Sequence, residues 1–158
     1  MILDKLLQFD PAATAAAAII VAGVDSTNTL DCANARDMFH GKEKLVVVFT
    51  ITTAFVAAGG AASLILQLKG SADNVNFNVL AQTDQAGIPK ANLGANAVIH
   101  LPLGPYFSDP RASIPRYLKC TYLALTNPFT AGAFECDLVL SPQFNTAPTY
   151  AAGITVAN

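Results

Sequence analysis

Two runs of alternating apolar and polar residues, at 117–124 and 134–140, constrain the fold of this chain more than any other feature. Side chains of a β-strand alternate between its two faces, so each run predicts a strand with one buried face. The segment between the runs contains Pro128 and Gly132, which suit a reversal of the backbone. Residues 115–142 are therefore interpreted as a long β-hairpin that a second sheet must cover. Its predicted inward residues are Leu118, Cys120, Tyr122, Ala124, Phe134, Cys136, Leu138 and Leu140.

The other strands are predicted from β-branched and aromatic residues that lie between turn-forming segments. They are expected at 15–24, 27–32, 43–55, 63–69, 77–82 and 97–103. The 43–69 segment is interpreted as a second hairpin, turned by Gly59 and Gly60. This pattern predicts an all-β fold, a jelly-roll type antiparallel β-sandwich of about eight strands. An immunoglobulin-like sandwich is the alternative, but the chain has no Trp for the buried position of that fold.

Both ends of the chain are apolar. Residues 1–10 have the spacing of a helical stripe that Pro11 ends, and a helix this short is marginal in water. It must dock on its own domain or on a neighbouring subunit, and both readings stay open. We therefore divide the chain into an N-terminal arm or short helix (1–14), a β-sandwich domain (15–142) and an extended C-terminal tail (143–158). The candidate protein–protein contacts are Ile2, Leu3, Leu6, Leu7, Phe9, Phe129, Tyr150, Ile154 and Val156.

Composition narrows the class of protein. Hydrophobic residues make up 53% of the 158 residues and charged residues only 13%, against the ~25% that is typical of soluble domains. Such a chain is expected to hide surface against partners. No run reaches the ~20 apolar residues of a membrane-spanning helix, so no membrane association is expected. The net charge of −2, with scattered basic residues, argues against nucleic acid as a partner.

The three cysteines, Cys32, Cys120 and Cys136, have no metal-site spacing and leave one unpaired in any disulfide scheme. Cys120 and Cys136 could face each other across the predicted hairpin, although buried free thiols are the favoured reading. Residues 12–24 resemble the core of a secretory signal, but Asp4 and Asp10 give the wrong charge balance. We therefore expect a protein made in a reducing cytoplasm.

The sequence offers few groups for chemistry. Strong short motifs of catalysis are missing, and no catalytic residue, cofactor or metal is predicted. Three weak alternatives stay open: a nucleophile beside a histidine, a carboxylate pair roughly 7 Å apart on one strand face, and a calcium site. For each of them the favoured reading is the plain one: structural histidines, solvated acids and an Asx-rich turn. The groups concerned are Cys32 with His40, Ser113 with His100, Glu135 with Asp137, and the oxygens of Asp73, Asn74, Asn76 and Asn78.

Four short stretches carry a resemblance to a known family. They are MILDKLLQF at 1–9, LKGSAD at 68–73, RYLK at 116–119 and TAG at 130–132. Together they resemble the small capsid cement proteins of short-tailed bacteriophages. The chain departs from that family in its alanine-rich segments 12–18 and 57–62 and in Asp10, where Ser is more usual.

The resemblance implies a structural capsid cement or decoration protein, not an enzyme. It implies a jelly roll on the outer capsid surface of the virion, where dimers brace junctions between subunits of the major capsid protein. A homodimer or a higher homo-oligomer on the capsid is therefore expected, and deletion of residues 1–10 is expected to release it from heads without unfolding the body. A carbohydrate- or receptor-binding module of a virion is the alternative, with Tyr106, Phe107, Tyr117 and Phe129 as its aromatic platforms.

Overall fold

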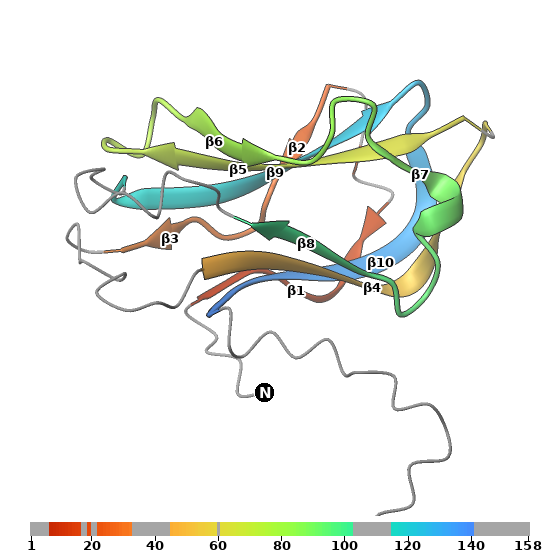
Figure 1. Ribbon diagram of the computed structural model, residues 1–158, viewed down its shortest axis with the longest axis horizontal. Helices are drawn as coiled ribbons and strands as arrows, with labels where there is room; N and C mark the ends of the chain where they lie inside the picture. The colour runs from red at the N-terminus through yellow and green to blue at the C-terminus, as the bar shows by residue number, and fades with distance from the viewer. Residues whose placement is uncertain are drawn as a thin grey trace, which may run out of the picture.

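The computed structural model of this protein describes residues 7–16, 19, 22–32, 45–59, 61–102 and 115–140. Its strands form two antiparallel sheets that lie face to face (Figure 1). Sheet A contains, in order, β1 (Gln8–Ala15), β10 (Phe129–Leu140), β4 (Leu45–Ala57) and β8 (Val98–Pro102). Sheet B contains, in order, β2 (Val24–Asp25), β9 (Tyr117–Leu125), β5 (Ser63–Ser71) and β6 (Asn78–Gln82), with β3 (Leu30–Asp31) on β9 and β7 (Ile88–Pro89) on β5. A 3-10 turn, η3 (Lys90–Asn92), follows β7.

The order of the strands is that of a jelly roll. The first strand, β1, pairs with the last, β10; β2 and β3 both pair with β9; β4 pairs with β8; and β5 pairs with β6. Successive pairs thus alternate between the sheets, as expected when a chain wraps a two-layered sandwich. The predicted all-β, jelly-roll sandwich is confirmed.

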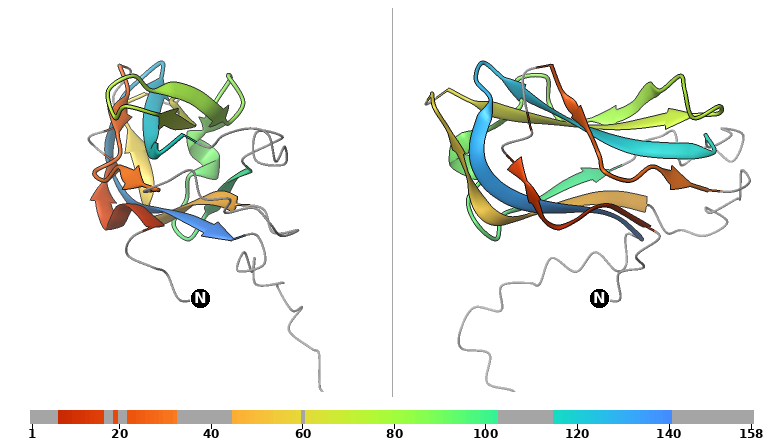
Figure 2. Two further views of the ribbon diagram at one scale, coloured as in Figure 1. Left: turned by 90° about the vertical axis from the view of Figure 1, so that its left-hand side faces the viewer. Right: turned by 180° about the vertical axis from the view of Figure 1, so that it is seen from behind.

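Both predicted hairpins are wrong, although their strands exist. β9 lies in sheet B and β10 in sheet A, and β4 and β5 are likewise in different sheets. The short connections at 58–62 and 126–128 therefore cross from one layer to the other (Figure 2). Alternation shows which side chains point inward but not which strand lies alongside, because the pattern is the same for either partner.

The N-terminal segment also differs from the prediction. Residues 8–10 belong to β1, so a helix over that part of 1–10 is wrong, and residues 1–6 lie outside the described residues. Pairing with β10 overrides the helical spacing, because hydrogen bonds to a neighbouring strand stabilise a segment too short to be helical alone. Sheet A therefore includes residues 8–14 of the predicted arm. Of the predicted strand at 15–24, Ala15 lies in β1 and Val24 in β2, whereas residues 17, 18, 20 and 21 lie outside the described residues.

The core lies between the sheets and is centred on aromatic rings. Phe49 stacks on Phe134 with ring centroids 4.7 Å apart, and Tyr122 meets Phe134 edge-on at 5.0 Å. Phe55 continues the cluster towards Phe129, also at 5.0 Å. The inward faces of β9 and β10 are as predicted for Leu118, Cys120, Tyr122, Ala124, Phe134, Cys136 and Leu138, all of which are buried.

A bulge in β10 shapes this end of the core. Its register with β4 shifts between Ala131 and Ala133, and Gly132 between them has φ +126°, where other residues are strained. A Cβ on Gly132 would lie 2.7 Å from Cδ1 of Phe55. Figure 2 shows that β10 curves round one end of the sandwich. The glycine therefore allows β10 to bend while the aromatic rings stay packed.

Candidate functional site

The outward face of sheet A carries a second hydrophobic cluster, separate from the core. It consists of Val46, Val48 and Val139, all less than a tenth exposed. Their chain neighbours Val47 and Leu138 point into the core, so alternation places the three valines on the opposite face. Val46 pairs directly with Val139 across β4 and β10. We call this group the outer cluster.

Asp137 adjoins the outer cluster. It is the register partner of Val48, and its side chain is 3% exposed rather than solvated as predicted. Its Oδ1 accepts no hydrogen bond within the described part of the chain. Burial, reinforced by nearby Glu135, raises the pKa of Asp137 to about 6, although a hydrogen bond from Gln8 opposes the shift. The outer face of sheet A thus holds a buried acid beside an apolar patch.

The carboxylate pair does not form an open site. Glu135 is half-buried and lies on the same face as Asp137, as predicted, but Asp137 is closed to solvent. A pair of glycosidase carboxylates needs both groups in reach of a substrate. The solvated reading therefore holds in part for Glu135 and is wrong for Asp137.

His100 is not brought close to either acid. It pairs with Val48, which itself pairs with Asp137, so two strand spacings, about 10 Å, separate the Cα atoms of His100 and Asp137. Burial lowers the pKa of His100 below its ordinary value. Its proposed partner Ser113 lies outside the described residues, as does His40, the partner considered for Cys32.

The chain enters and leaves sheet A beside the outer cluster. β1 begins at Gln8, the register partner of Asp137, and β10 ends at Leu140, the partner of Leu45. The segments that precede β1 and follow β10 are therefore joined to the sheet at the same end. Within the described residues, the points at which the two terminal segments join the sandwich thus lie on neighbouring strands.

The predicted contact residues fall into three groups. Phe9 and Phe129, at 0% and 2% exposed, are core residues of this domain and offer no surface to a partner. Leu7 is half-buried and packs against the same core. The rest lie outside the described residues: Ile2, Leu3, Leu6, Tyr150, Ile154 and Val156.

A buried polar group that the sequence did not reveal fixes β1 to sheet B. Asp10 is 1% exposed, and its carboxyl group accepts hydrogen bonds from the backbone N–H of Thr27 at 2.9 Å and from the Thr27 hydroxyl at 2.7 Å. The hydroxyl of Tyr122, on β9, donates a third. From the sequence, Asp10 stood out only for its charge and as a departure from the resembled family. Alternation from the buried Phe9 would place Asp10 on the opposite face, but the register of β1 with β10 shifts between Gln8 and Asp10, and the sequence does not reveal that shift.

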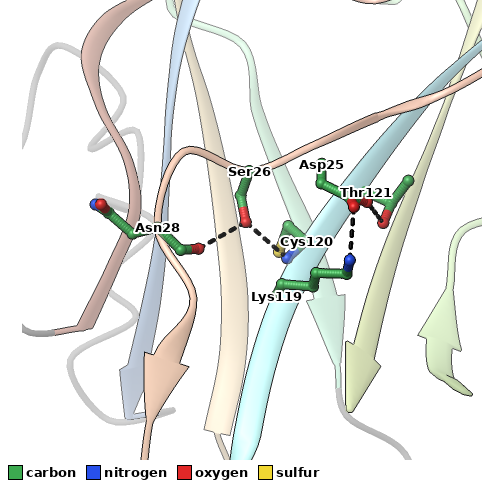
Figure 3. Close-up of polar contacts among 6 residues, drawn as sticks. All are labelled: Asp25, Ser26, Asn28, Lys119, Cys120 and Thr121. Atoms are coloured by element: carbon green, nitrogen blue, oxygen red, sulfur yellow. Dashed lines mark hydrogen bonds and ion pairs between the residues drawn. The ribbon is translucent and has the colours of Figure 1, made fainter. Parts of the chain in front are cut away.

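Further polar contacts hold β2 against β9 (Figure 3). Lys119 lies 2.6 Å from Asp25, whose carboxyl group also accepts a hydrogen bond from Thr121. Partial burial opposes ionisation of Asp25, but these two partners outweigh it and lower the pKa. The hydroxyl of Ser26 accepts from the backbone N–H of Cys120 and donates to the carbonyl of Asn28. These groups are all used within the fold and leave no open site.

The Asx-rich segment is a turn, as favoured from the sequence. The carboxyl oxygens of Asp73 accept hydrogen bonds from Ser71, from the backbone N–H of Val75, and from both the backbone and the side chain of Asn76. These bonds lower the pKa of Asp73. Its oxygens are thus committed to the turn. The described residues contain no group of three or more His, Cys, Asp or Glu that could bind a metal ion.

Comparison with known proteins identifies the family to which this chain belongs. No curated protein sequence matches this chain. Within the described residues, no helix is both long and apolar enough to cross a bilayer. The profile of one family, Bbp16, matches residues 13–138. That match runs from β1 into β10 and so covers nearly the whole sandwich, and the chain therefore belongs to Bbp16, a family associated with bacteriophages.

Proposed function

We propose that this chain is a structural cement or decoration protein that binds the outer surface of a phage head and stabilises contacts between major capsid subunits. The observation that carries the proposal is the jelly-roll sandwich of a phage-associated family, to which both apolar ends of the chain are joined at the same end of sheet A. Val46, Val48 and Val139 are each less than a tenth exposed and offer little surface themselves, so the proposed contacts are the apolar residues of the two termini. Membership of a phage-associated family supports a partner in the virion.

The proposed attachment combines a rigid body with two adhesive ends. The jelly roll keeps its own core, while Ile2, Leu3, Leu6, Tyr150, Ile154 and Val156 supply apolar side chains for the capsid. Each Leu or Ile that becomes fully buried on a neighbour contributes roughly 1.5–3 kcal/mol before the cost of ordering the segment. A few such residues, repeated across a shell, stabilise the whole particle.

The remaining parts of the proposal concern partners and location. The major capsid protein is the partner, and the chain acts as a homodimer or higher homo-oligomer on the capsid. It is made in the host cytoplasm, needs no cofactor and catalyses no reaction. The charge of −2 suits the outer surface better than an interior that faces DNA.

Removal of residues 1–6 tests this function. The cut keeps β1 intact, whereas the deletion of 1–10 would also remove Phe9 and Asp10 from the core and unfold part of the sandwich. We expect the shortened protein to keep its far-UV spectrum and urea midpoint. Added to heads that lack it, it should bind in fewer copies and give less protection against heat.

A matched variant strengthens the experiment. The substitution Gln143→Ala, three positions after the end of β10 in the sequence, changes the tail without removing an apolar group, and the variant should bind heads as the full chain does. If the protein without residues 1–6 decorates heads and protects them as well as the full chain, the N-terminal contact is wrong. If neither protein binds heads at all, the capsid function itself is wrong.

The carbohydrate-binding alternative has no specific support. Of its four aromatic platforms, Phe129 is buried in the core, and Tyr106 and Phe107 lie outside the described residues. Tyr117 is half-buried with the guanidinium of Arg116 over its ring at 4.9 Å from the centroid. A sugar would have to displace that cation to stack on the ring.

A further inference from the structure

Two thiols face each other in the middle of the sandwich. Cys120 belongs to β9 in sheet B and Cys136 to β10 in sheet A, so they oppose each other across the core rather than across a hairpin. Both are 0% exposed, and their sulfur atoms lie 3.7 Å apart. Nothing in the function proposed above uses them.

We propose that Cys120 and Cys136 form an intramolecular disulfide that joins the two sheets covalently when the protein meets a two-electron oxidant. The chemical class of that oxidant is a diazenedicarboxamide such as diamide. Both S–H bonds break and one S–S bond forms. The two protons and two electrons pass to the N=N bond of the oxidant, which becomes a hydrazine.

The geometry favours this bond over any other cysteine pairing. The sulfur atoms must approach from 3.7 Å to about 2.05 Å, a change within reach of small side-chain rotations and a slight closing of the sheets. Both strands are held in register by long ladders, β9 with β5 and β10 with β4, so the two thiols stay opposed. Cys32, the third thiol, is half-buried beside the core after β3.

Burial also controls the rate of the reaction. It raises the pKa of the Cys120 thiol well above its ordinary value, so little of the reactive thiolate is present in the folded state. The oxidant therefore reacts during brief openings of the sandwich. We expect oxidation to be slow in buffer and faster in urea below the unfolding transition, with a single intramolecular product in both cases.

The experiment uses the full chain carrying Cys32→Ser, in which only the core pair can react. The protein is treated with diamide, unfolded and alkylated with iodoacetamide. We expect a mass lower by two hydrogen atoms with no alkyl group added, and a peptide map that joins 120 to 136. We expect Tm to rise by roughly 5–10 °C, as for a loop of this length, and to return to its original value under dithiothreitol.

Two controls decide the outcome. A second variant, with Cys136→Ala added, should take up one alkyl group after the same treatment and show no change in Tm. Wild-type protein treated with diamide should give the same linkage, and untreated wild-type protein mapped in parallel should give none. The proposal is overturned if both core thiols still alkylate after diamide in sub-denaturing urea, if the bonds found join separate molecules, or if the linked protein melts at a lower temperature. This test does not depend on the capsid function.

Discussion

The hydrogen bond from Tyr122 to Asp10 should be a main anchor of the first strand. The substitution Tyr122→Phe removes one hydroxyl and keeps the ring against Phe49 and Phe134, whose centroids lie 5.6 Å and 5.0 Å away. The Asp10 carboxyl group is 1% exposed, so water cannot replace the lost donor. Thr27 still donates two hydrogen bonds to the other oxygen, Oδ1. Only Oδ2 is therefore left without its partner.

The expected loss follows from that single unsatisfied oxygen. A buried acceptor that loses its donor destabilises a protein by about 1–3 kcal/mol. For a chain of this length that corresponds to a fall in Tm of roughly 3–10 °C. Urea unfolding of the wild type and the variant, with a common m-value, measures the change in the free energy of unfolding.

A matched tyrosine supplies the control. Tyr117→Phe, on the same strand, should change stability by no more than about 0.5 kcal/mol, because Tyr117 is only half-buried. A double-mutant cycle with Asp10→Ala should show a coupling of about 1 kcal/mol or more between Asp10 and Tyr122. If Tyr122→Phe is as mild as Tyr117→Phe, or the coupling vanishes, the anchor described here does not hold β1.

Three further changes test other parts of the structure. Gly132→Ala should lower the free energy of unfolding by about 2 kcal/mol or more, because the new Cβ would lie 2.7 Å from Phe55 and the backbone there has φ +126°. Gly94→Ala is the control: a Cβ there has nothing within 4 Å, so the cost should be less than about 1 kcal/mol, and the urea midpoints of the two variants are compared. Thr126→Gly should stabilise by about 1 kcal/mol in the same assay, since Thr126 has φ +69°; an unchanged midpoint would contradict that strain. Folding raises the pKa of Asp137 from 3.8 to about 6, so this acid favours the folded state most below pH 4 and loses that contribution as pH rises to 6. Unfolding measured from pH 4 to 7 should therefore show wild type losing about 1–3 kcal/mol relative to Asp137→Asn, and parallel curves would refute the shift.

The sequence predicted which side chains of each strand point into the core better than it predicted which strands pair with each other. The inward residues of β9 and β10, such as Tyr122 and Phe134, were placed correctly because alternation depends on each strand alone. Strand partners depend on the route of the chain between layers. A turn at 126–128 or at 58–62 has much the same composition whether it joins strands of one sheet or of two, so both hairpins were misread.

The candidate site was predictable only in part. The prediction that the acidic residues of β10 lie on its outward face was correct, but the burial of Asp137 depends on neighbouring segments that the sequence of β10 does not specify. Phe9 was correctly marked as a residue that seeks an apolar surface, yet that surface is the domain's own core. Asp10 and Tyr122 are separated by 112 positions, and no local pattern joins an acid to a phenol over that distance.

The pairing of the first strand with the last has a consequence for how the protein is made. Gln8 pairs with Asp137, so the ribosome must add a further 129 residues (137 − 8) after Gln8 before that contact can form. Contacts of such long range slow folding, because the loop must close before the pairing stabilises it. On the ribosome β1 has no partner until β10 emerges, and β4 lacks one of its two neighbours until then. Sheet A can therefore be completed only after β10 has been translated, and a chain that stops before β10 leaves β1 unpaired and exposes one edge of β4 to neighbouring molecules.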